Sequence, residues 1–267
     1  MKHLLRFPLF PLVVMAFAAN VWASSFSSSS SQAGEEIHFK PGEIIAFAKK
    51  VERTMGEKGA RVAILARMGR PASELPEGMH FTHVGFAVYS SITTSDGRSV
   101  PGYAIYNLYQ RDGRPDISDL VNDYPVDFFA GVAQLEAGVL IPSPDLQQKL
   151  LDVIASPTYA ALHEPHYSVI ANPYTLGRQN CTEFTLDVIN AAMYGTSDIN
   201  VIKAKEKESF VAQPVNVSPL KLIFGSMLSA EVSTSDQSGQ PVTATFERIA
   251  EYLAQYDKGS SVLTVLP

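Results

Sequence analysis

Two runs of β-branched and aromatic residues constrain the fold of this chain more than any other feature. They are FTHVGFAVY (81–89) and YAIYNLYQ (103–110), and the segment between them, SSITTSDGRSVPG, has the composition of a turn. Together they predict an antiparallel hairpin with a long connection. Shorter apolar runs at 61–67 and 131–142 predict two further strands.

Segments with helical periodicity lie on both sides of these strands. A helix is predicted over 41–56, because Pro41 suits a first turn and apolar residues follow at helical spacing. Further helices are predicted to begin after Ser143 and at Cys181, and two more over 219–232 and 243–256. One helix, several strands and then more helices predict a mixed α+β domain.

The first 23 residues are typical of a cleavable signal peptide. A basic start, a short apolar run and small residues before Ser24 are the features of such a segment. The apolar run is too short to predict a stable membrane span. A flexible Ser-rich leader is predicted over 24–34, a main domain over 35–215 and a helical extension over 216–267. The expected location is periplasmic or secreted.

The charge of the chain excludes some classes of partner. The sequence has 21 basic and 27 acidic residues, a formal net charge of −6. Cleavage would remove Lys2 and Arg6, and 19 basic against 27 acidic residues give −8. Basic residues form no block, so nucleic acid and anionic membrane surfaces are not expected partners.

Cys181 is the only cysteine of the chain, and it lies in the polar segment GRQNCTEF. In an oxidising compartment such a thiol has no partner within the molecule. Asn180 is a preferred N-cap residue, and Glu183 has the spacing of a capping box. Cys181 is therefore predicted in the first turn of a helix, where the helix dipole favours the nucleophilic thiolate.

His83 is the candidate base. Alternation places His83 and Gly85 on one face of their strand, and Val84, Phe86 and Val88 on the opposite, core face. The small residues that follow His83 leave room for a helix or a substrate backbone. The two histidines of HEPH (163–166) lack the spacing of a zinc site and are expected on a loop surface.

His-Val-Gly on a strand, with Asn-Cys-x-Glu-Phe opening a later helix, resembles the circularly permuted NlpC-like papain group. This group includes the YiiX-like and the lecithin:retinol acyltransferase-like proteins. Ordinary papain-like enzymes have the cysteine before the histidine, and the permuted branch has the reverse order. The similarity covers roughly residues 60–195, and segments within it also look like an uncharacterised family of exported bacterial proteins.

The resemblance implies a permuted papain-like (NlpC-type) α+β domain, with an antiparallel sheet packed against helices and extra C-terminal helices. It implies Cys181 as nucleophile, His83 as general base and then acid, and a third polar residue that orients the imidazole. Asn107 is the first choice for this third residue, because the antiparallel return brings it beside His83. Gln110 is the second, although alternation places it on the opposite face unless a bulge intervenes. Relatives have histidine or glutamate there, and an amide does not stabilise an imidazolium as a charge does.

The implied chemistry is acyl transfer without a cofactor or metal. The Cys181 thiolate would attack an amide or ester carbonyl, with its own N–H in the oxyanion hole. The expected substrate is a cell-envelope peptide, a lipid or a small acyl compound. Five tyrosines are candidates for an amphipathic pocket, with packing inside strands and loops as the alternative. They are Tyr103, Tyr106, Tyr109, Tyr167 and Tyr174.

Three other interpretations of the same residues remain open. The first is a non-catalytic module that binds a cell-envelope or lipid ligand in the same groove. The second is a metal site made of Cys181, His83 and a histidine of HEPH. The third is a disulfide-linked dimer through Cys181.

Overall fold

The computed structural model describes residues 38–215 and 233–267. The predicted signal peptide (1–23), the leader (24–34) and the helix predicted over 219–232 lie outside the described residues. Within the described ranges, no helix is long and apolar enough to cross a membrane.

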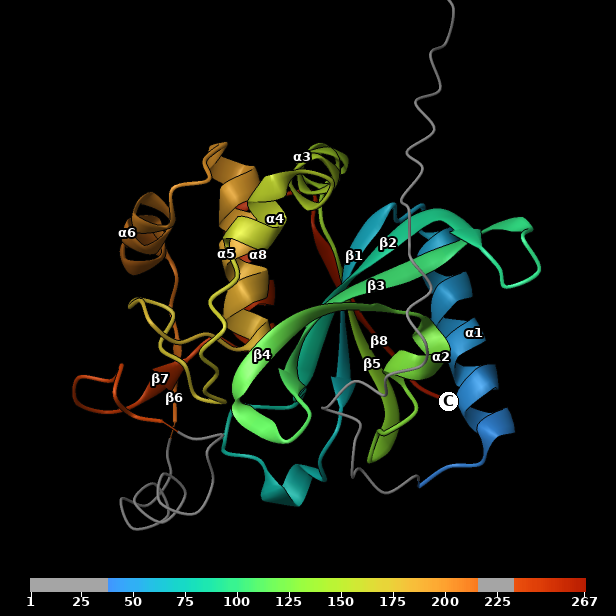
Figure 1. The fold of residues 1–267 in the computed structure, drawn as a ribbon, viewed down its shortest axis with the longest axis horizontal. Helices are drawn as coiled ribbons and strands as arrows, with labels where there is room; N and C mark the ends of the chain where they lie inside the picture. The colour runs from blue at the N-terminus through green and yellow to red at the C-terminus, as the bar shows by residue number, and fades with distance from the viewer. Residues whose placement is uncertain (1–37, 216–232) are drawn as a thin grey trace, which may run out of the picture.

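A six-stranded sheet forms the centre of the molecule, and every neighbouring pair of its strands is antiparallel (Figure 1). The strand order is β4-β3-β2-β1-β5-β8. The bounds of the six strands are β1 Val62–Met68, β2 His83–Thr93, β3 Ser99–Arg111, β4 Arg114–Asp123, β5 Gln134–Ile141 and β8 Ser261–Val265. A separate pair joins β6 (Gln213–Pro214) to β7 (Val242–Thr243).

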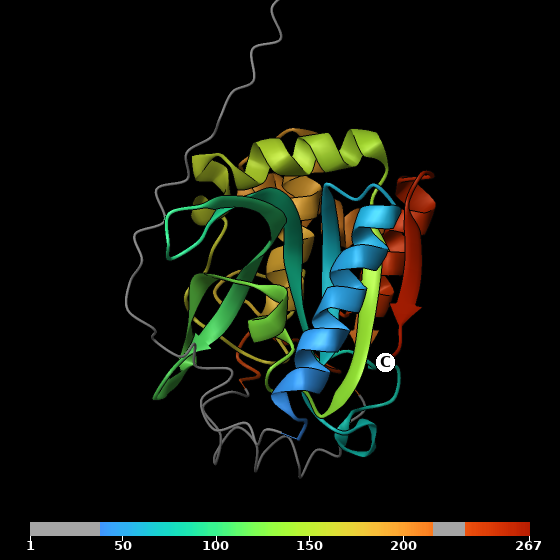
Figure 2. The same ribbon diagram turned by 90° about the vertical axis from the view of Figure 1, so that its right-hand side faces the viewer.

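Helices cover both faces of the sheet, so the fold has three layers (Figures 1 and 2). On one face α1 packs against apolar residues of the sheet beside α2, and on the other face five helices, α3, α4, α5, α6 and α8, pack around a second apolar core. The helices are α1 Pro41–Glu57, α2 Pro125–Phe128, α3 Pro144–Ile154, α4 Pro157–Ala161, α5 Cys181–Tyr194, α6 Ile199–Ser209 and α8 Phe246–Tyr256, with a short 3-10 turn at Ala72–Glu74. The prediction of a mixed α+β fold with an antiparallel sheet packed against helices is confirmed.

The predicted hairpin forms, but its strands are longer than the sequence suggested. β2 continues to Thr93 and β3 begins at Ser99, so the connection is short where a long one was predicted. The reason is that Ile92 pairs with Val100, and these β-branched residues extend the ladder into the polar segment.

Two strands at opposite edges of the sheet, β4 and β8, were not predicted. The sequence of β4, RPDISDLVND, lacks an apolar run because an edge strand leaves many side chains in solvent. The helix predicted over 243–256 begins only at Phe246, since the Thr245 side chain caps it and Thr243 pairs in β7.

A buried group of charges joins α5 to α6. Lys203 Nζ of α6 lies 2.8 Å from Glu183 Oε1 and 2.7 Å from Asp187 Oδ1, both on α5, and 3.2 Å from Glu206 Oε2. One half of the predicted capping box is present, because the backbone N–H of Glu183 donates to Asn180 Oδ1. The other half is wrong, because the Glu183 carboxylate accepts from Lys203 and not from the backbone of Asn180. Burial raises the pKa of Glu183 to about 8.

Lys203→Ala is expected to lower the free energy of unfolding by about 3–5 kcal/mol, because it leaves three buried carboxylates without a cation. The variant should regain stability as the pH falls, since protonation removes the uncompensated charges. Urea unfolding at several pH values measures both effects.

Lys205→Ala is the matched control on the same helix, because Lys205 is exposed and pairs with Glu208 at the surface. Its expected cost is below about 1 kcal/mol. Equal losses in the two variants would contradict the structural role given to Lys203.

Candidate active site

Gly85 allows the side chains of His83 and Asn107 to meet. Asn107 of β3 is paired in register with Gly85 of β2. A Cβ on Gly85 would collide with Asn107 Oδ1, so the missing side chain leaves the space that this amide occupies. Asn107 Oδ1 then lies 3.1 Å from His83 Nε2. The small residue after His83 makes room for this amide, and not for a helix or a substrate backbone.

The hydrogen bonds of Asn107 define which nitrogen of His83 carries the proton. Asn107 Nδ2 donates to Asp123 Oδ1 at 2.9 Å and to the backbone oxygen of Ile105 at 3.3 Å. The amide oxygen therefore faces His83, and as an acceptor it requires the donor Nε2–H. Neutral His83 then has its lone pair on Nδ1, which is the nitrogen available as a base.

His83 is held in its neutral form by its surroundings. Its ring stacks on Tyr109 at a centroid distance of 4.6 Å and lies 5.6 Å from the ring of Phe128. Burial and, to a smaller extent, the Arg67 guanidinium lower the pKa of His83 to about 3, although the hydrogen bond to Asn107 acts in the opposite direction. At neutral pH His83 is an uncharged base.

The thiol of Cys181 lies against the backbone beside His83. The pairing of β2 with β3 starts at Gly85 and Asn107, so the first residues of β2, His83 and Val84, are not paired with β3. Beyond Asn107, β3 is still paired with β4. Cys181, the first residue of α5, packs at this point. Its Sγ accepts a hydrogen bond from the N–H of Val84, which belongs to the peptide bond that follows His83. The fold thus brings the start of α5 to the start of β2.

The electrostatic state of Cys181 differs from the prediction. The N–H groups of Val84 and Thr182, its own N–H and Arg67 all favour the thiolate. Burial outweighs them and raises the pKa of Cys181, which is only 5% exposed. The expected push toward thiolate at the helix start is real, but desolvation reverses the net shift.

Two further polar residues, Asp123 and Arg67, lie close to His83 and Asn107, and sequence reasoning did not select them. Asp123, at the end of β4, accepts from Asn107 and from the Tyr109 hydroxyl at 2.9 Å, and burial raises its pKa to about 7. Arg67 pairs with His83 in the β1–β2 register and lies over the ring of Tyr109. Arg67 could have been noticed as a charge closing an apolar strand, whereas Asp123 carried no signal because β4 was not predicted.

The remaining candidates lie elsewhere. Gln110 donates to the backbone oxygen of Pro115 and has no hydrogen bond to His83. His166 of HEPH is exposed as expected and pairs with Glu164. The prediction that His163 lies on a loop surface is wrong, because this residue is half-buried and its Nε2 lies 2.9 Å from Ser118 Oγ. Among residues 38–215 and 233–267, no group of three or more His, Cys, Asp or Glu side chains could hold a metal ion.

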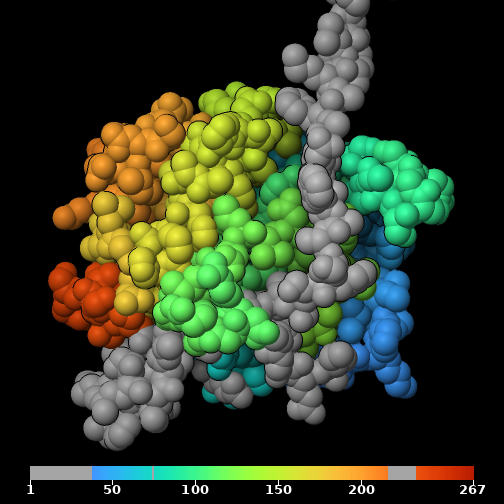
Figure 3. All heavy atoms as spheres, viewed as in Figure 1, coloured from blue at the N-terminus to red at the C-terminus, as the bar shows by residue number. Residues whose placement is uncertain are grey.

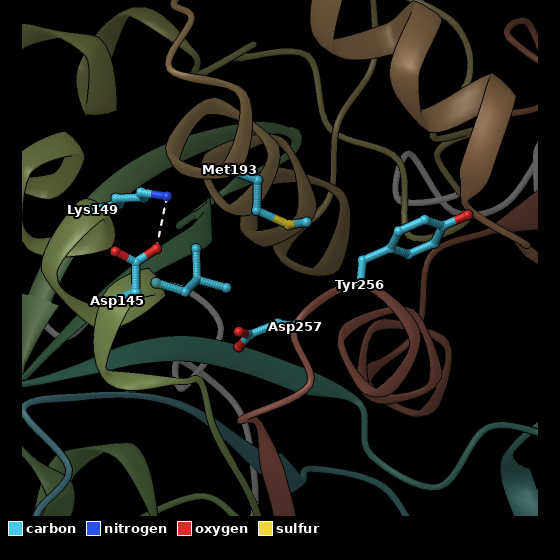
Figure 4. A pocket seen from close by; sticks show the side chains of 6 residues that line it. Asp145, Lys149, Met193, Tyr256 and Asp257 are labelled. Atoms are coloured by element: carbon cyan, nitrogen blue, oxygen red, sulfur yellow. Dashed lines mark ion pairs between the residues drawn. The ribbon is translucent and has the colours of Figure 1, made fainter.

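Four of the candidate tyrosines make side-chain contacts within the protein, Tyr106 and Tyr109 through their rings and Tyr103 and Tyr174 through their hydroxyls. Tyr103 donates its hydroxyl to the backbone oxygen of Ala60, and Tyr174 donates to that of Phe210. A surface hollow lies at the other end of α5, between α3 and α8 (Figure 4). Its lining is Asp145, Leu146, Lys149, Met193, Tyr256 and Asp257, and Lys149 is ion-paired with Asp145. It contains none of the candidate catalytic residues.

The residues on either side of Cys181 are held by a segment near the C-terminus. This segment, 233–245, borders residues 168–180 in the space-filling view (Figure 3). Asn180 Nδ2 donates to Thr243 Oγ1 at 3.1 Å, and Thr182 Oγ1 donates to the backbone oxygen of Ala244 at 2.8 Å. The position of the thiol therefore depends on segment 233–245 as well as on α5.

Comparison with known proteins gives one family. A family model described as "Uncharacterized protein conserved in bacteria (DUF2145)" matches residues 54–253, which include β1 to β5 and α5. No curated protein and no solved structure matches the chain.

Gly85→Ala is expected to destabilise the protein by about 1–3 kcal/mol, because the new Cβ displaces the Asn107 amide in a packed sheet. Gly56→Ala is the control, since nothing lies within 4 Å of a Cβ at this position in α1. The control should gain about 0.5–1 kcal/mol from better helix propensity. Chemical denaturation compares the two, and a neutral Gly85→Ala would contradict the close approach.

His83 should make the protein sensitive to acid. Its pKa falls from 6.5 in the unfolded chain to about 3 in the folded protein, so its stabilising contribution is complete above pH 6.5. That contribution is lost as the pH falls toward 3. The variant His83→Gln, which does not titrate, should lose less stability than the wild type over this interval. Urea unfolding at stepped pH measures both slopes, and equal slopes would be inconsistent with a buried neutral His83.

Proposed function

We propose that this chain, which belongs to the bacterial protein family DUF2145, is an exported cysteine hydrolase or acyltransferase that acts on an amide or ester bond. Cys181 is the nucleophile, His83 the general base and then acid, and Asn107 the residue that orients the imidazole. One observation carries the proposal. The Cys181 sulfur accepts a hydrogen bond from the backbone N–H of Val84, the residue after His83. Nε2 of His83 is hydrogen-bonded to Asn107 Oδ1.

The order of the elements supports a permuted papain-like (NlpC-type) domain. The histidine opens a strand of an antiparallel sheet, the amide follows on the next strand, and the cysteine opens a later helix packed on that sheet. Chains of this permuted kind have the histidine before the cysteine, as this sequence does. Nucleophilic acyl transfer requires a thiol beside an imidazole that a third polar group orients, and the proposal gives these roles to Cys181, His83 and Asn107.

The reaction starts from an uncharged pair. The thiol gives its proton to Nδ1 of His83 as Sγ bonds to the substrate carbonyl carbon, because neither group is ionised beforehand. The N–H at the start of α5 stabilises the resulting oxyanion. His83 then returns the proton to the leaving nitrogen or oxygen as its bond to carbon breaks. Water or another acceptor finally releases the acyl group from the thioester.

Access to the thiol requires movement. Cys181 is 5% exposed and His83 is 8% exposed, so a substrate carbonyl reaches the sulfur only when neighbouring side chains are displaced. Segment 233–245 holds both residues that flank Cys181, so its displacement would release the backbone on either side of the thiol. A cell-envelope peptide, a lipid or a small acyl compound remains the proposed substrate class.

The same burial favours one alternative, a non-catalytic module that binds such a ligand at this place. A raised thiol pKa is typical of a structural cysteine more than of a reactive one. The alternative differs from the enzyme in one respect, because binding does not require His83 to act as a base.

Acylation by an activated ester separates the two. p-Nitrophenyl acetate should give a burst of p-nitrophenolate with the wild type and an acetyl group on Cys181, and Cys181→Ala should give neither. His83→Ala should acylate about 100-fold more slowly, the smaller end of the usual contribution of a general base. Mass spectrometry locates the acetyl group.

His80→Ala is the matched control, because His80 lies three residues before His83 and bonds to Glu136 near the surface. It should acylate at the wild-type rate. Equal rates in the wild type and His83→Ala would remove the enzyme proposal and favour the binding module. If His83→Ala is slower as expected, a screen of amides and esters with the wild type would identify the bond that is cleaved.

A further inference from the structure

We propose that Asp123 is a positioning residue of this site, whose carboxylate acts through Asn107 to fix the proton-accepting form of His83 and to compensate its charge. The inference rests on the proposed function and deepens it. Nothing in the sequence distinguished this aspartate from the other acidic residues of β4.

The Asp123 carboxylate accepts hydrogen bonds from Asn107 and Tyr109, the two residues that contact the imidazole of His83 at its edge and its face. Asp123 Oδ1 accepts from Asn107 Nδ2 at 2.9 Å, and Asn107 Oδ1 lies 3.1 Å from His83 Nε2. Asp123 Oδ2 accepts from the Tyr109 hydroxyl at 2.9 Å, and the Tyr109 ring stacks on His83 with an interplanar angle of 13°. One oxygen thus fixes the edge of the imidazole through the amide, and the other fixes its face through the tyrosine.

Protonation of His83 during the reaction requires a negative charge close to the imidazole. When His83 takes the thiol proton it becomes a buried cation, and Arg67 of β1 opposes this charge. Asn107 is neutral and cannot compensate it. The groups that act on Asp123 itself are Tyr109 and Asn107 of β3, Arg67 of β1 and Asp127 of α2. Asp123 is the carboxylate in this set that is linked to His83 through a single amide.

Ionisation of Asp123 selects the histidine tautomer. As a carboxylate it accepts from Asn107 Nδ2, which turns the amide oxygen to His83 and places the proton on Nε2. A protonated Asp123 carries a hydrogen that can be donated to the amide oxygen. The amide then turns its nitrogen to Nε2, and the imidazole proton moves to Nδ1, where it blocks the transfer from sulfur. Burial raises the pKa of Asp123 to about 7, so the base form of the site is gained as the pH rises through neutrality.

The test has two measurements on the full chain, with Asp123→Asn as the variant. Nitrogen NMR of the histidines, recorded in a Cys181→Ala background, identifies the tautomer of His83 without any reaction. At about pH 8 the Nε2–H form should dominate, and the Nδ1–H form should appear in Asp123→Asn. Titration of the unsubstituted Asp123 protein should show the same tautomer change with a midpoint near pH 7.

The second measurement is the pH profile of acylation of Cys181 by p-nitrophenyl acetate. The wild type should show a rise with a midpoint near pH 7 that Asp123→Asn lacks. The variant should be at least about 10-fold slower at pH 8, because the charge behind the base is missing. Asp119→Asn is the matched control, because Asp119 lies on the same strand and pairs with Arg111 at the surface. It should match the wild type in both measurements.

The outcomes separate the two proposals. A wild type that is not acylated, with a tautomer that changes on loss of Asp123, would remove the hydrolase and keep the positioning role. A wild type that is acylated, with an unchanged tautomer and pH profile in Asp123→Asn, would overturn the positioning role alone. Should Asp123→Asn fail to fold, the titration of the tautomer in the protein that retains Asp123 decides, and its absence across pH 7 overturns the inference.

Discussion

The contact between His83 and Asn107 depends on one missing atom, the Cβ that Gly85 lacks. Two neighbouring strands of an antiparallel sheet place side chains from the same face about 5 Å apart, too close for a third group to lie between them. Glycine at one of the paired positions lets the Asn107 amide lean over β2 and reach the imidazole two residues along. The rest of the site is built around this bond.

Burial is the main cause of the pKa shifts of Cys181, His83 and Asp123. It raises the pKa of Cys181, lowers that of His83 and raises that of Asp123, and in each case it is the largest cause. The resting pair is therefore a thiol and a neutral imidazole, not a thiolate and an imidazolium.

The helix that carries the thiol is fixed at several points. Segment 233–245 bonds to the residues on either side of Cys181, and the Lys203 cluster joins the first half of α5 to α6. Buried ion pairs contribute little net stability but are costly to break, so separating α5 from α6 would be costly. The placement of one sulfur thus depends on residues spread over the second half of the chain.

The sequence by itself determined the elements whose signals are local. The apolar spacing of α1, the β-branched runs of β2 and β3 and the Asn180 cap before Cys181 each depend on neighbours along the chain. The choice of Asn107 needed, besides the antiparallel return of β3, the family pattern that places a polar residue on the strand after the histidine. The tertiary structure decided what depends on burial and on distant neighbours. The edge strands β4 and β8 have no apolar signal of their own. The Glu183 carboxylate pairs with Lys203, twenty positions away, and does not cap its own helix. The pKa of Cys181 has the opposite shift from that expected at a helix start, because desolvation is set by everything that packs around the sulfur.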